Sequence, residues 1–191
     1  MDEQIGRVLD ALEAFGLAKN TLVLFSSDNG ASQGGGGSNS PFRGWKHSLY
    51  EGGIREPLIV RWPSRVPAGR VDEQSVLNVC DLIPTICGLT GATMPAAYQP
   101  DGEDITRALR GERFERVKPQ FWHYPTTGLS LAIRVGNWKL LTTSDGRRQE
   151  LYDLAEDAGE TTNLAGDRPE IAKSLTERLL TWQDELPLPT N

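Results

Sequence analysis

Long apolar runs are missing from this sequence of 191 residues. A membrane-spanning helix needs about 20 consecutive apolar residues, and the start, MDEQIGRV, lacks the basic and then apolar order of a signal peptide. A basic surface is not expected either, because 20 basic residues stand against 26 acidic ones and the formal charge is -6. Nucleic-acid binding requires such a surface. The composition therefore argues against a membrane or a nucleic acid as partner, and it leaves the cellular compartment unknown.

Reactive side chains and standard catalytic motifs are scarce. The two cysteines, Cys80 and Cys87, share a predicted helix, and their spacing favours small buried hydrophobic residues over a disulfide or a metal pair. The sequence has no G-x-S-x-G, no H-E-x-x-H and no P-loop. Residues 32–41 are rich in glycine, but no Lys-Ser or Lys-Thr follows them, so they indicate a mobile surface loop rather than a phosphate cradle.

The polar residues that do attract attention follow a short apolar run. Residues 22–25 are long enough for one buried strand, and the chain continues as Ser26-Ser27-Asp28-Asn29-Gly30. In open α/β sheets, ligands bind beyond the carboxyl ends of the strands. Asp28 and Asn29 together offer the oxygen ligands that a hard cation prefers. Asp-Asn-Gly is also a common turn sequence, so a plain turn is the alternative interpretation.

The first part of the chain predicts alternating helices and strands. Apolar residues recur at helical spacing over residues 2–15, and the strand of residues 22–25 comes next. This order is typical of parallel α/β units. A second strand is predicted over 58–62 and a helix over 76–89. Because Pro84 falls inside this helix, we expect either a kink or a new helix start near Asp81.

The hydrophobic period changes after Gln120. Short apolar runs separated by glycine-containing turns predict an antiparallel meander, and a helix over 171–182 would cover one of its faces. We therefore divide the chain near residues 110–119, into an α/β segment of residues 1–111 and a small α+β segment of residues 112–191.

A longer pattern surrounds the Asp-Asn pair and identifies a family. Ser27-Asp28-Asn29-Gly30 is followed by the glycine-rich loop, then by K-x-x-x-x-E-G-G-I-R-E-P over residues 46–57 and a strand. This pattern closely resembles the type I sulfatases of the alkaline-phosphatase-like superfamily. Further matching motifs follow in order at residues 81–85, 133–140, 150–154 and 160–164. The resemblance covers nearly the whole chain and corresponds to the C-terminal part of such an enzyme.

The resemblance implies a fold and a set of site residues. The implied fold is a partial alkaline-phosphatase-like sheet with helices, followed by a small antiparallel sheet packed by a C-terminal helix. Asp28 and Asn29 match two oxygen ligands of a calcium or magnesium ion. Lys46 matches the lysine that contacts the sulfate group and stabilises its charge during transfer. Without the flanking motif, Lys46 would be read as a solvated loop lysine. Arg55 is expected to pair with a carboxylate such as Glu51 or Glu56.

Two histidines are weaker candidates. His47 stands where the family usually has a small residue, and we expect it to be an exposed loop side chain. His123, within Phe-Trp-His-Tyr, is expected to pack in the small sheet. In an alternative reading, either could join Asp28 and Asn29 in holding a metal ion that activates water.

Parts of the family pattern do not occur in this sequence. Neither Cys80 nor Cys87 stands in the C-x-P-x-R or S-x-P-x-R sequence that carries the formylglycine nucleophile, and the N-terminal aspartate pair is missing. Met1 resembles a methionine from the interior of the family's chain. We therefore expect a weakly held metal ion at most, no formylglycine, and an apolar edge at the strand of residues 22–25 that favours a homodimer through this edge or the first helix.

Three functions are consistent with the sequence. The chain is the C-terminal segment of a sulfatase, not competent alone for sulfate ester hydrolysis through formylglycine. Alternatively, it is a self-standing metal-dependent hydrolase with a different small-molecule substrate, such as a phosphate ester. The third possibility is a non-catalytic module that assembles with itself.

Overall fold

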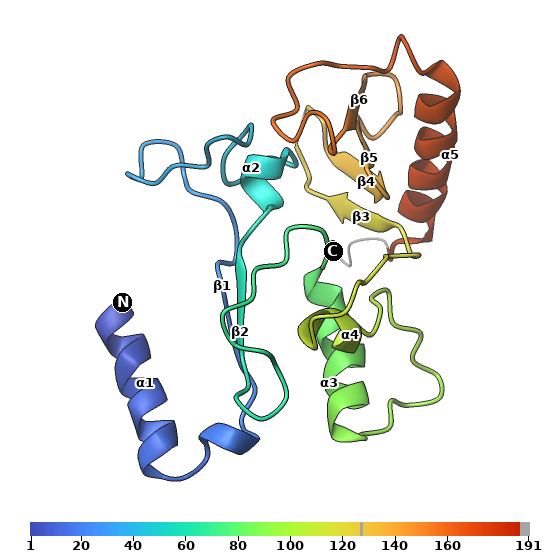
Figure 1. The fold of residues 1–191 in the computed structure, drawn as a ribbon. Coiled ribbons are helices and arrows are strands. Elements are labelled where there is room, and N and C mark those ends of the chain that lie inside the picture. The colour runs from blue at the N-terminus through green and yellow to red at the C-terminus, as the bar shows by residue number, and fades with distance from the viewer. Residues whose placement is uncertain (127, 188–191) are drawn as a thin grey trace. The chain divides into compact units, whose positions relative to one another are not determined.

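The computed structural model describes residues 1–126 and 128–187, which form two compact units. Unit 1 comprises Met1–Ser27 and Pro57–Lys118, and unit 2 comprises Asp28–Glu56 and the chain from Pro119 onward. The chain therefore passes between the units three times (Figure 1). The expected division into residues 1–111 and 112–191 stays a prediction about domains, and each packing unit is described by itself.

Unit 1 combines a two-stranded sheet with short helices. Its strands are β1 (Val23–Ser26) and β2 (Leu58–Arg61). They pair antiparallel, with Val23 opposite Arg61 and Ser26 opposite Leu58. The parallel arrangement that the helix–strand order indicated is therefore wrong for this strand pair. The helical elements are α1 (Asp2–Ala14), α3 (Leu82–Thr90), α4 (Thr106–Leu109) and the 3-10 turns η1 (Ala18–Asn20) and η2 (Val79–Asp81).

Of the two alternatives, the new helix start near Asp81 is confirmed, whereas residues 76–78 of the predicted helix are not helical. The η2 turn precedes α3, and Pro84 lies in the first turn of α3, where a missing N–H costs no hydrogen bond. Asn78 and Asp81 form a capping box: the Asn78 side chain accepts from the Cys80 amide at 3.0 Å, and the Asp81 carboxylate accepts from the Asn78 amide at 2.6 Å. The core of unit 1 consists of Trp62, Leu89, Ile105 and Leu109.

The helix α1 was expected over residues 2–15, and this is confirmed. Gly16, with φ of 68°, follows it in the left-handed conformation that commonly ends helices. None of the residues of α1 is buried. Val8 and, just beyond the helix, Phe15 are 58% and 78% exposed.

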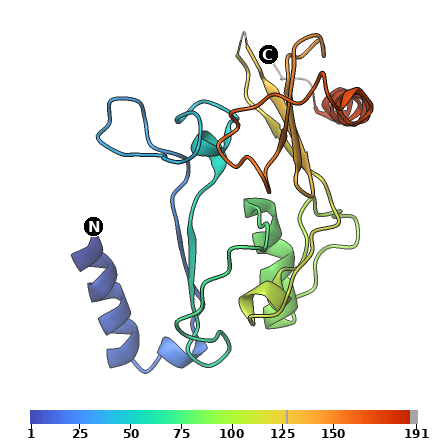
Figure 2. The same ribbon diagram turned by 45° about the horizontal axis from the view of Figure 1, so that its top comes forward.

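Unit 2 is built on a four-stranded antiparallel meander, as the sequence predicted. Its strands follow chain order: β3 (Gln120–His123), β4 (Leu131–Val135), β5 (Trp138–Thr142) and β6 (Gln149–Asp153). The helix α5 (Pro169–Glu185) and the short helix α2 (Glu51–Ile54) lie on opposite sides of this sheet (Figure 2).

Each face of this sheet has its own apolar cluster, because side chains alternate along a strand. The face under α5 is formed by Leu131, Ile133, Leu140, Leu151, Ala172, Leu175 and Leu179. The opposite face carries Ala132, Leu141, Tyr152 and Leu154, and these pack against Leu49, with Tyr50 and Ile54 at the edge. The segment 28–56 is thus the second cover of the sheet. No helix in the described parts of the chain is long and apolar enough to cross a membrane.

Candidate functional site

The segment 28–56 folds back on itself, so that its two ends lie side by side. The Gly30 amide donates to the Gly53 carbonyl at 3.1 Å, and the Lys46 amide donates to the Ala31 carbonyl at 3.1 Å. The Gly52 amide donates to the Arg43 carbonyl at 2.7 Å. The Asp28–Gly30 turn and Lys46, which are distant in sequence, are therefore neighbours in the backbone of one unit.

The glycines of this segment permit close approach of backbone to backbone. A Cβ atom on Gly30 would lie 1.9 Å from the Gly52 carbonyl oxygen, and one on Gly53 would lie 2.2 Å from the Ser48 carbonyl oxygen. No side chain fits at such distances. Gly30 and Gly53 therefore have a structural role in this segment.

Asn39, within the glycine-rich stretch, stabilises the same fold-back. Its Oδ1 accepts from the Ala31 amide at 2.8 Å, and its Nδ2 donates to the carbonyls of Ala31 at 3.2 Å and Gly44 at 3.0 Å. Sequence reasoning missed this residue, because an asparagine among glycines and serines is also ordinary loop composition.

Asp28 and Asn29 stand at the start of the segment, two residues beyond β1. Asp28 is exposed and Asn29 is half-buried, with its Nδ2 donating to the Gly30 carbonyl at 3.0 Å. A carboxylate and a carboxamide are suitable oxygen ligands for calcium or magnesium, but calcium takes about six to eight. Within residues 1–126 and 128–187, no three or more His, Cys, Asp and Glu side chains form a group that could hold a metal ion. The pair fits a metal ion as a partial set of ligands.

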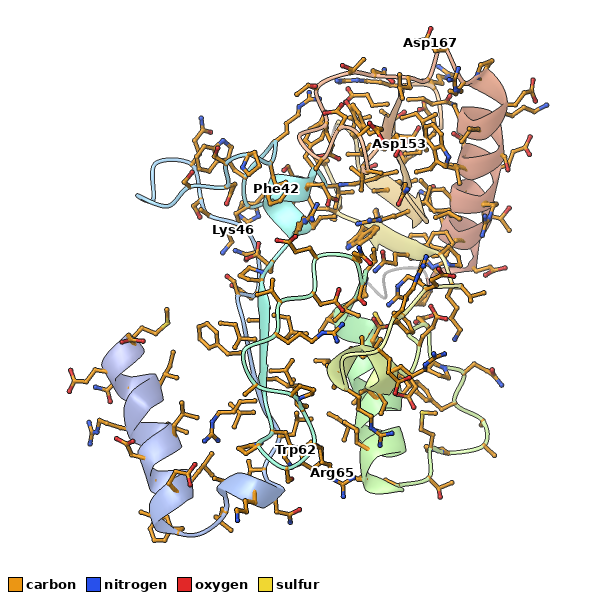
Figure 3. The ribbon with its side chains drawn as sticks, in the orientation of Figure 1. Phe42, Lys46, Trp62, Arg65, Asp153 and Asp167 are labelled. Atoms are coloured by element: carbon orange, nitrogen blue, oxygen red, sulfur yellow. The ribbon has the colours of Figure 1, made fainter. Side chains whose placement is uncertain are left out.

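Lys46 lies on the loop that leads to α2, beside that helix (Figure 3). Its side chain is half-buried. Its neighbour His47 adopts a left-handed φ of 74°, which is uncommon for a residue other than glycine. The residue that follows Lys46 therefore has a backbone conformation that L-residues other than glycine rarely adopt.

His47 and His123 have different environments. The His47 side chain is exposed, as expected, and its Nδ1 lies 2.9 Å from the Tyr124 hydroxyl, with the two rings stacked at 5.6 Å. His123 ends β3 and pairs with Leu131 in the ladder, but its side chain is exposed rather than packed in the sheet. Tyr124 was not singled out from the sequence, since its partner lies 77 positions away.

A buried charge cluster anchors α2 to the sheet. Lys139 and Glu160 are both 0% exposed, and Glu51 is 3% exposed. The Lys139 Nζ lies 2.8 Å from Glu51 Oε1 and 2.8 Å from Glu160 Oε1. The other carboxylate oxygen of Glu160 accepts from the Glu51 amide at 2.6 Å. Burial raises the pKa of the Glu160 carboxyl, and the Lys139 ammonium only partly offsets this. The expected pairing of Arg55 with Glu51 is confirmed at 3.6 Å.

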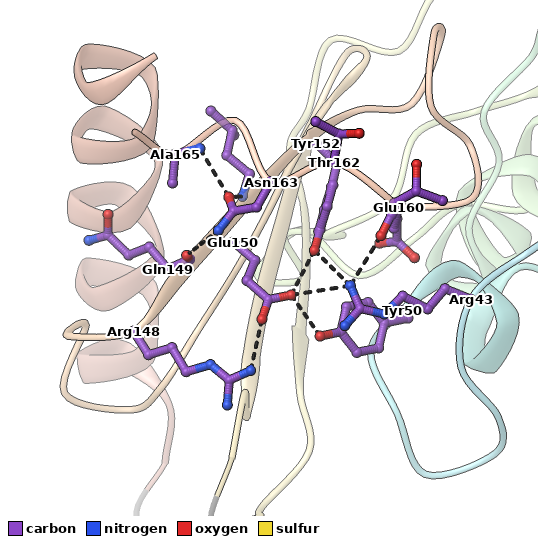
Figure 4. Close-up of polar contacts among 12 residues, drawn as sticks. Arg43, Tyr50, Arg148, Gln149, Glu150, Tyr152, Glu160, Thr162, Asn163 and Ala165 are labelled. Carbon is purple, nitrogen blue, oxygen red and sulfur yellow. Dashed lines mark hydrogen bonds and ion pairs between the residues drawn. The ribbon is translucent and has the colours of Figure 1, made fainter. Parts of the chain in front are cut away.

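A second network connects the loop to β6 (Figure 4). The guanidinium of Arg43 lies 3.9 Å over the Tyr50 ring and donates to the Tyr152 hydroxyl at 2.9 Å and the Glu160 carbonyl at 3.1 Å. Glu150 accepts from the hydroxyls of Tyr50 and Tyr152, both at 2.7 Å. Burial and the neighbouring Glu150 carboxylate raise the pKa of Tyr50 to about 12.

Glu150 is the centre of this network. Besides the two tyrosines, it accepts from Arg148 at 2.8 Å. Burial by itself would raise the pKa of the Glu150 carboxyl, but hydrogen bonds from Tyr152, Tyr50 and Arg148 outweigh it and hold the pKa below its usual value. Glu150 is therefore a buried carboxylate that stays charged near neutral pH.

Comparisons with known proteins show which proteins this chain is similar to. The Sulfatase family model matches residues 1–92. A sulfatase of Formosa agariphila is 33% identical over 95% of this chain, which covers 38% of that protein. The steryl-sulfatase of Mus musculus is 41% identical over 73% of this chain, covering 24% of its length. The chain thus spans less than half the length of the curated relatives it matches.

Solved structures extend the likeness to the fold. The crystal structure of Ps i-CgsB in complex with k-i-k-neocarrahexaose has a TM-score of 0.85 and 28% identity, over 95% of this chain and 40% of that one. A sulfatase structure from Bacteroides thetaiotaomicron has a TM-score of 0.69 and 27% identity, over 95% and 39%. The expected alkaline-phosphatase-like architecture is confirmed by these neighbours. The chain therefore belongs to the sulfatase family and corresponds to part of the length of its members.

Proposed function

We propose that this chain supplies part of the active site of a sulfuric ester hydrolase. Asp28 and Asn29 act as two ligands of a calcium or magnesium ion, and Lys46 binds the sulfate group of a small-molecule ester. The hydrogen bond from the Lys46 amide to the Ala31 carbonyl, at 3.1 Å, supports this most directly, because it brings the lysine beside the turn that carries the two ligands.

The chemistry of sulfate transfer accounts for this combination of side chains. The transferred group carries anionic oxygens, and an ammonium donor held near them stabilises their charge. A bound divalent ion would add Lewis-acid stabilisation of the same oxygens. The relatives are named for different sulfated compounds, among them a steryl-sulfatase and an N-acetylgalactosamine-6-O-sulfatase. The shared chemistry is hydrolysis of the sulfate ester of an alcohol.

We further propose that the 191-residue chain alone does not hydrolyse sulfate esters through formylglycine. Neither Cys80 nor Cys87 stands in a C-x-P-x-R sequence. Without such an activated group, an ordinary side chain is a far weaker nucleophile. Assays of the pure chain with an aryl sulfate should therefore show no turnover above a blank.

Sulfate binding tests the site itself. Inorganic sulfate should be titrated into the isotope-labelled chain with calcium present, and amide shifts followed by NMR. The signals of residues 28–56 should move with sulfate, and Lys46→Ala should abolish the change. Lys173→Ala, on the exposed surface of α5, is the matched control and should leave the titration unchanged. Equal binding by Lys46→Ala and the wild-type chain would refute the proposed role of Lys46.

A further inference from the structure

Two motifs of the sequence converge on the segment 28–56, although neither contributes a residue to the proposed set of Asp28, Asn29 and Lys46. Lys139 belongs to the motif of residues 133–140, and Glu160 begins the motif of residues 160–164. Both lie in contact with Glu51, the first residue of α2. Their side chains come from β5 and from the loop after β6. They therefore reach α2 from two separate parts of the sheet unit.

Stability alone is a poor explanation for this cluster. Removing charges from water costs more than their attraction commonly returns, and buried ion pairs can often be replaced by apolar side chains without loss. Here the lysine and the two carboxylates are almost completely buried on the sheet face where Ala132 and Leu141 are also buried. Unlike apolar contacts, charged hydrogen bonds hold the two partners in a defined relative geometry.

Glu160 shows this directional character most clearly. It has a left-handed φ of 55°, a conformation that costs free energy in a residue other than glycine. The adjoining turn is fixed by Asp157, whose carboxylate accepts from the amides of Thr161, at 2.8 Å, and Thr162, at 2.9 Å. In this conformation the Glu160 carboxylate meets the Glu51 amide, a donor that the helix itself cannot satisfy.

Backbone contacts connect α2 to both ends of the site. The carbonyl of Gly53 accepts from the Gly30 amide, next to Asn29, and the amide of Gly52 donates to the Arg43 carbonyl, three residues before Lys46. A shift of α2 would therefore displace both the turn that contains Asp28 and Asn29 and the loop that contains Lys46.

We propose that Lys139 and Glu160 are positioning residues: through Glu51 they fix α2 and thereby hold Asp28, Asn29 and Lys46 in one arrangement. The expected effect on sulfate binding rests on the proposed function. The geometry of the segment is tested independently of that function.

Hydrogen exchange of the 191-residue chain measures that geometry. In Lys139→Met, the protected amides of Gly30, Lys46 and Gly52 should exchange about a hundredfold faster, because one partner of a buried ion pair leaves the other charge unpaired. The amides between β4 and β5 should change much less. Sulfate affinity, measured by the titration above, should fall about tenfold as the loop opens.

The matched control is Leu140→Ala, which alters the neighbouring residue on the α5 face of the same strand. It should destabilise the unit without changing the ratio of exchange rates between loop and sheet, and without changing sulfate affinity. If Leu140→Ala reproduces the loop-specific exchange of Lys139→Met, or if Lys139→Met accelerates loop and sheet amides alike, the positioning role is refuted.

A second pair of variants covers the case in which Lys139→Met does not fold. Glu160→Gln keeps an oxygen acceptor for the Glu51 amide, whereas Glu160→Ala removes it. Loop protection should survive in the first and be lost in the second, and equal protection in both would overturn the proposal. If Lys46→Ala does not alter sulfate binding, the proposed function fails, and the exchange measurements still decide the positioning role.

Discussion

Replacing Glu150 by glutamine should weaken unit 2 near neutral pH, and the loss of stability should become smaller as the solution is made more acidic. Glu150 is 8% exposed and accepts from Tyr50, Tyr152 and Arg148. Its pKa is held below the ordinary value of 4.5. A depressed carboxyl pKa contributes stability that is fully present above the pKa of the unfolded chain and is lost as the pH falls through the folded pKa. The relevant window therefore lies below about pH 4.5.

The magnitude follows from the contacts. A glutamine oxygen can still accept from both tyrosines, but each bond loses its charge assistance, which is worth about 0.5–1.5 kcal/mol per bond. The Arg148 side chain is 61% exposed, so solvent screening reduces its contribution to about 0.5 kcal/mol. We expect Glu150→Gln to lower the free energy of unfolding of unit 2 by about 2–3 kcal/mol at pH 7. The difference should shrink as the pH falls below about 4.5 and through the depressed pKa of the folded chain, because protonation removes the charge that these hydrogen bonds favour.

Urea titrations at several pH values, followed by NMR, provide the measurement. The indole signal of Trp182 reports unit 2, because its ring stacks on Phe121 with centroids 4.9 Å apart. Glu177→Gln, on the exposed surface of α5, is the matched control and should change stability little at any pH. If Glu150→Gln is as stable as the wild-type chain at pH 7, or if its deficit does not shrink at all as the pH is lowered, the charge of Glu150 does not hold this network together.

Three further outcomes are expected. Calorimetry should show calcium binding with a Kd of about 1 mM or weaker, because two side-chain oxygens leave most of the coordination shell to water. Asp28→Ala should abolish this binding, and equal binding by the variant would place the ion elsewhere. We also propose self-association through α1 or the edge of β1, since α1 has no buried residue; light scattering over a dilution series should show a dimer that Leu9→Glu dissociates, and a monomer at every concentration would contradict this. Finally, Tyr50→Phe should remove one late step near pH 12 from the tyrosinate absorbance titration, and an unchanged curve would show that Tyr50 ionises earlier.

Local sequence patterns were sufficient for several elements. The spacing of apolar residues located α1, and the glycine-containing turns located the meander. The same patterns did not show that β1 and β2 pair antiparallel. The order of helices and strands along the chain does not specify which strands are neighbours in a sheet. The pairing of Arg55 with Glu51 was predictable because both residues belong to one short motif.

The buried residues that contact the segment 28–56 were harder to predict. Lys139 stands in a strand of the meander, where a charged residue is ordinarily read as facing solvent, yet it is completely buried. Its partners Glu51 and Glu160 are distant in sequence, and a single sequence contains no signal of such contacts. The same holds for Tyr124, whose partner is His47. Motif resemblance indicated the candidate residues Asp28, Asn29 and Lys46, whereas the buried contacts that we propose to position them could be found only in the structure.

The contact between Glu160 and Glu51 joins residues 109 positions apart, and this separation has a consequence for biosynthesis. At about 5–20 residues per second, a ribosome takes about 5–20 s to produce the chain between them. During that interval the segment 28–56 has been made but lacks the sheet that covers it, so its apolar residues Leu49 and Ile54 are exposed to chaperones and to aggregation. Unit 1, whose last residue is Lys118, can be complete before the sheet of unit 2 exists. The rate of translation between residues 57 and 160 therefore sets how long the nascent loop remains without its cover.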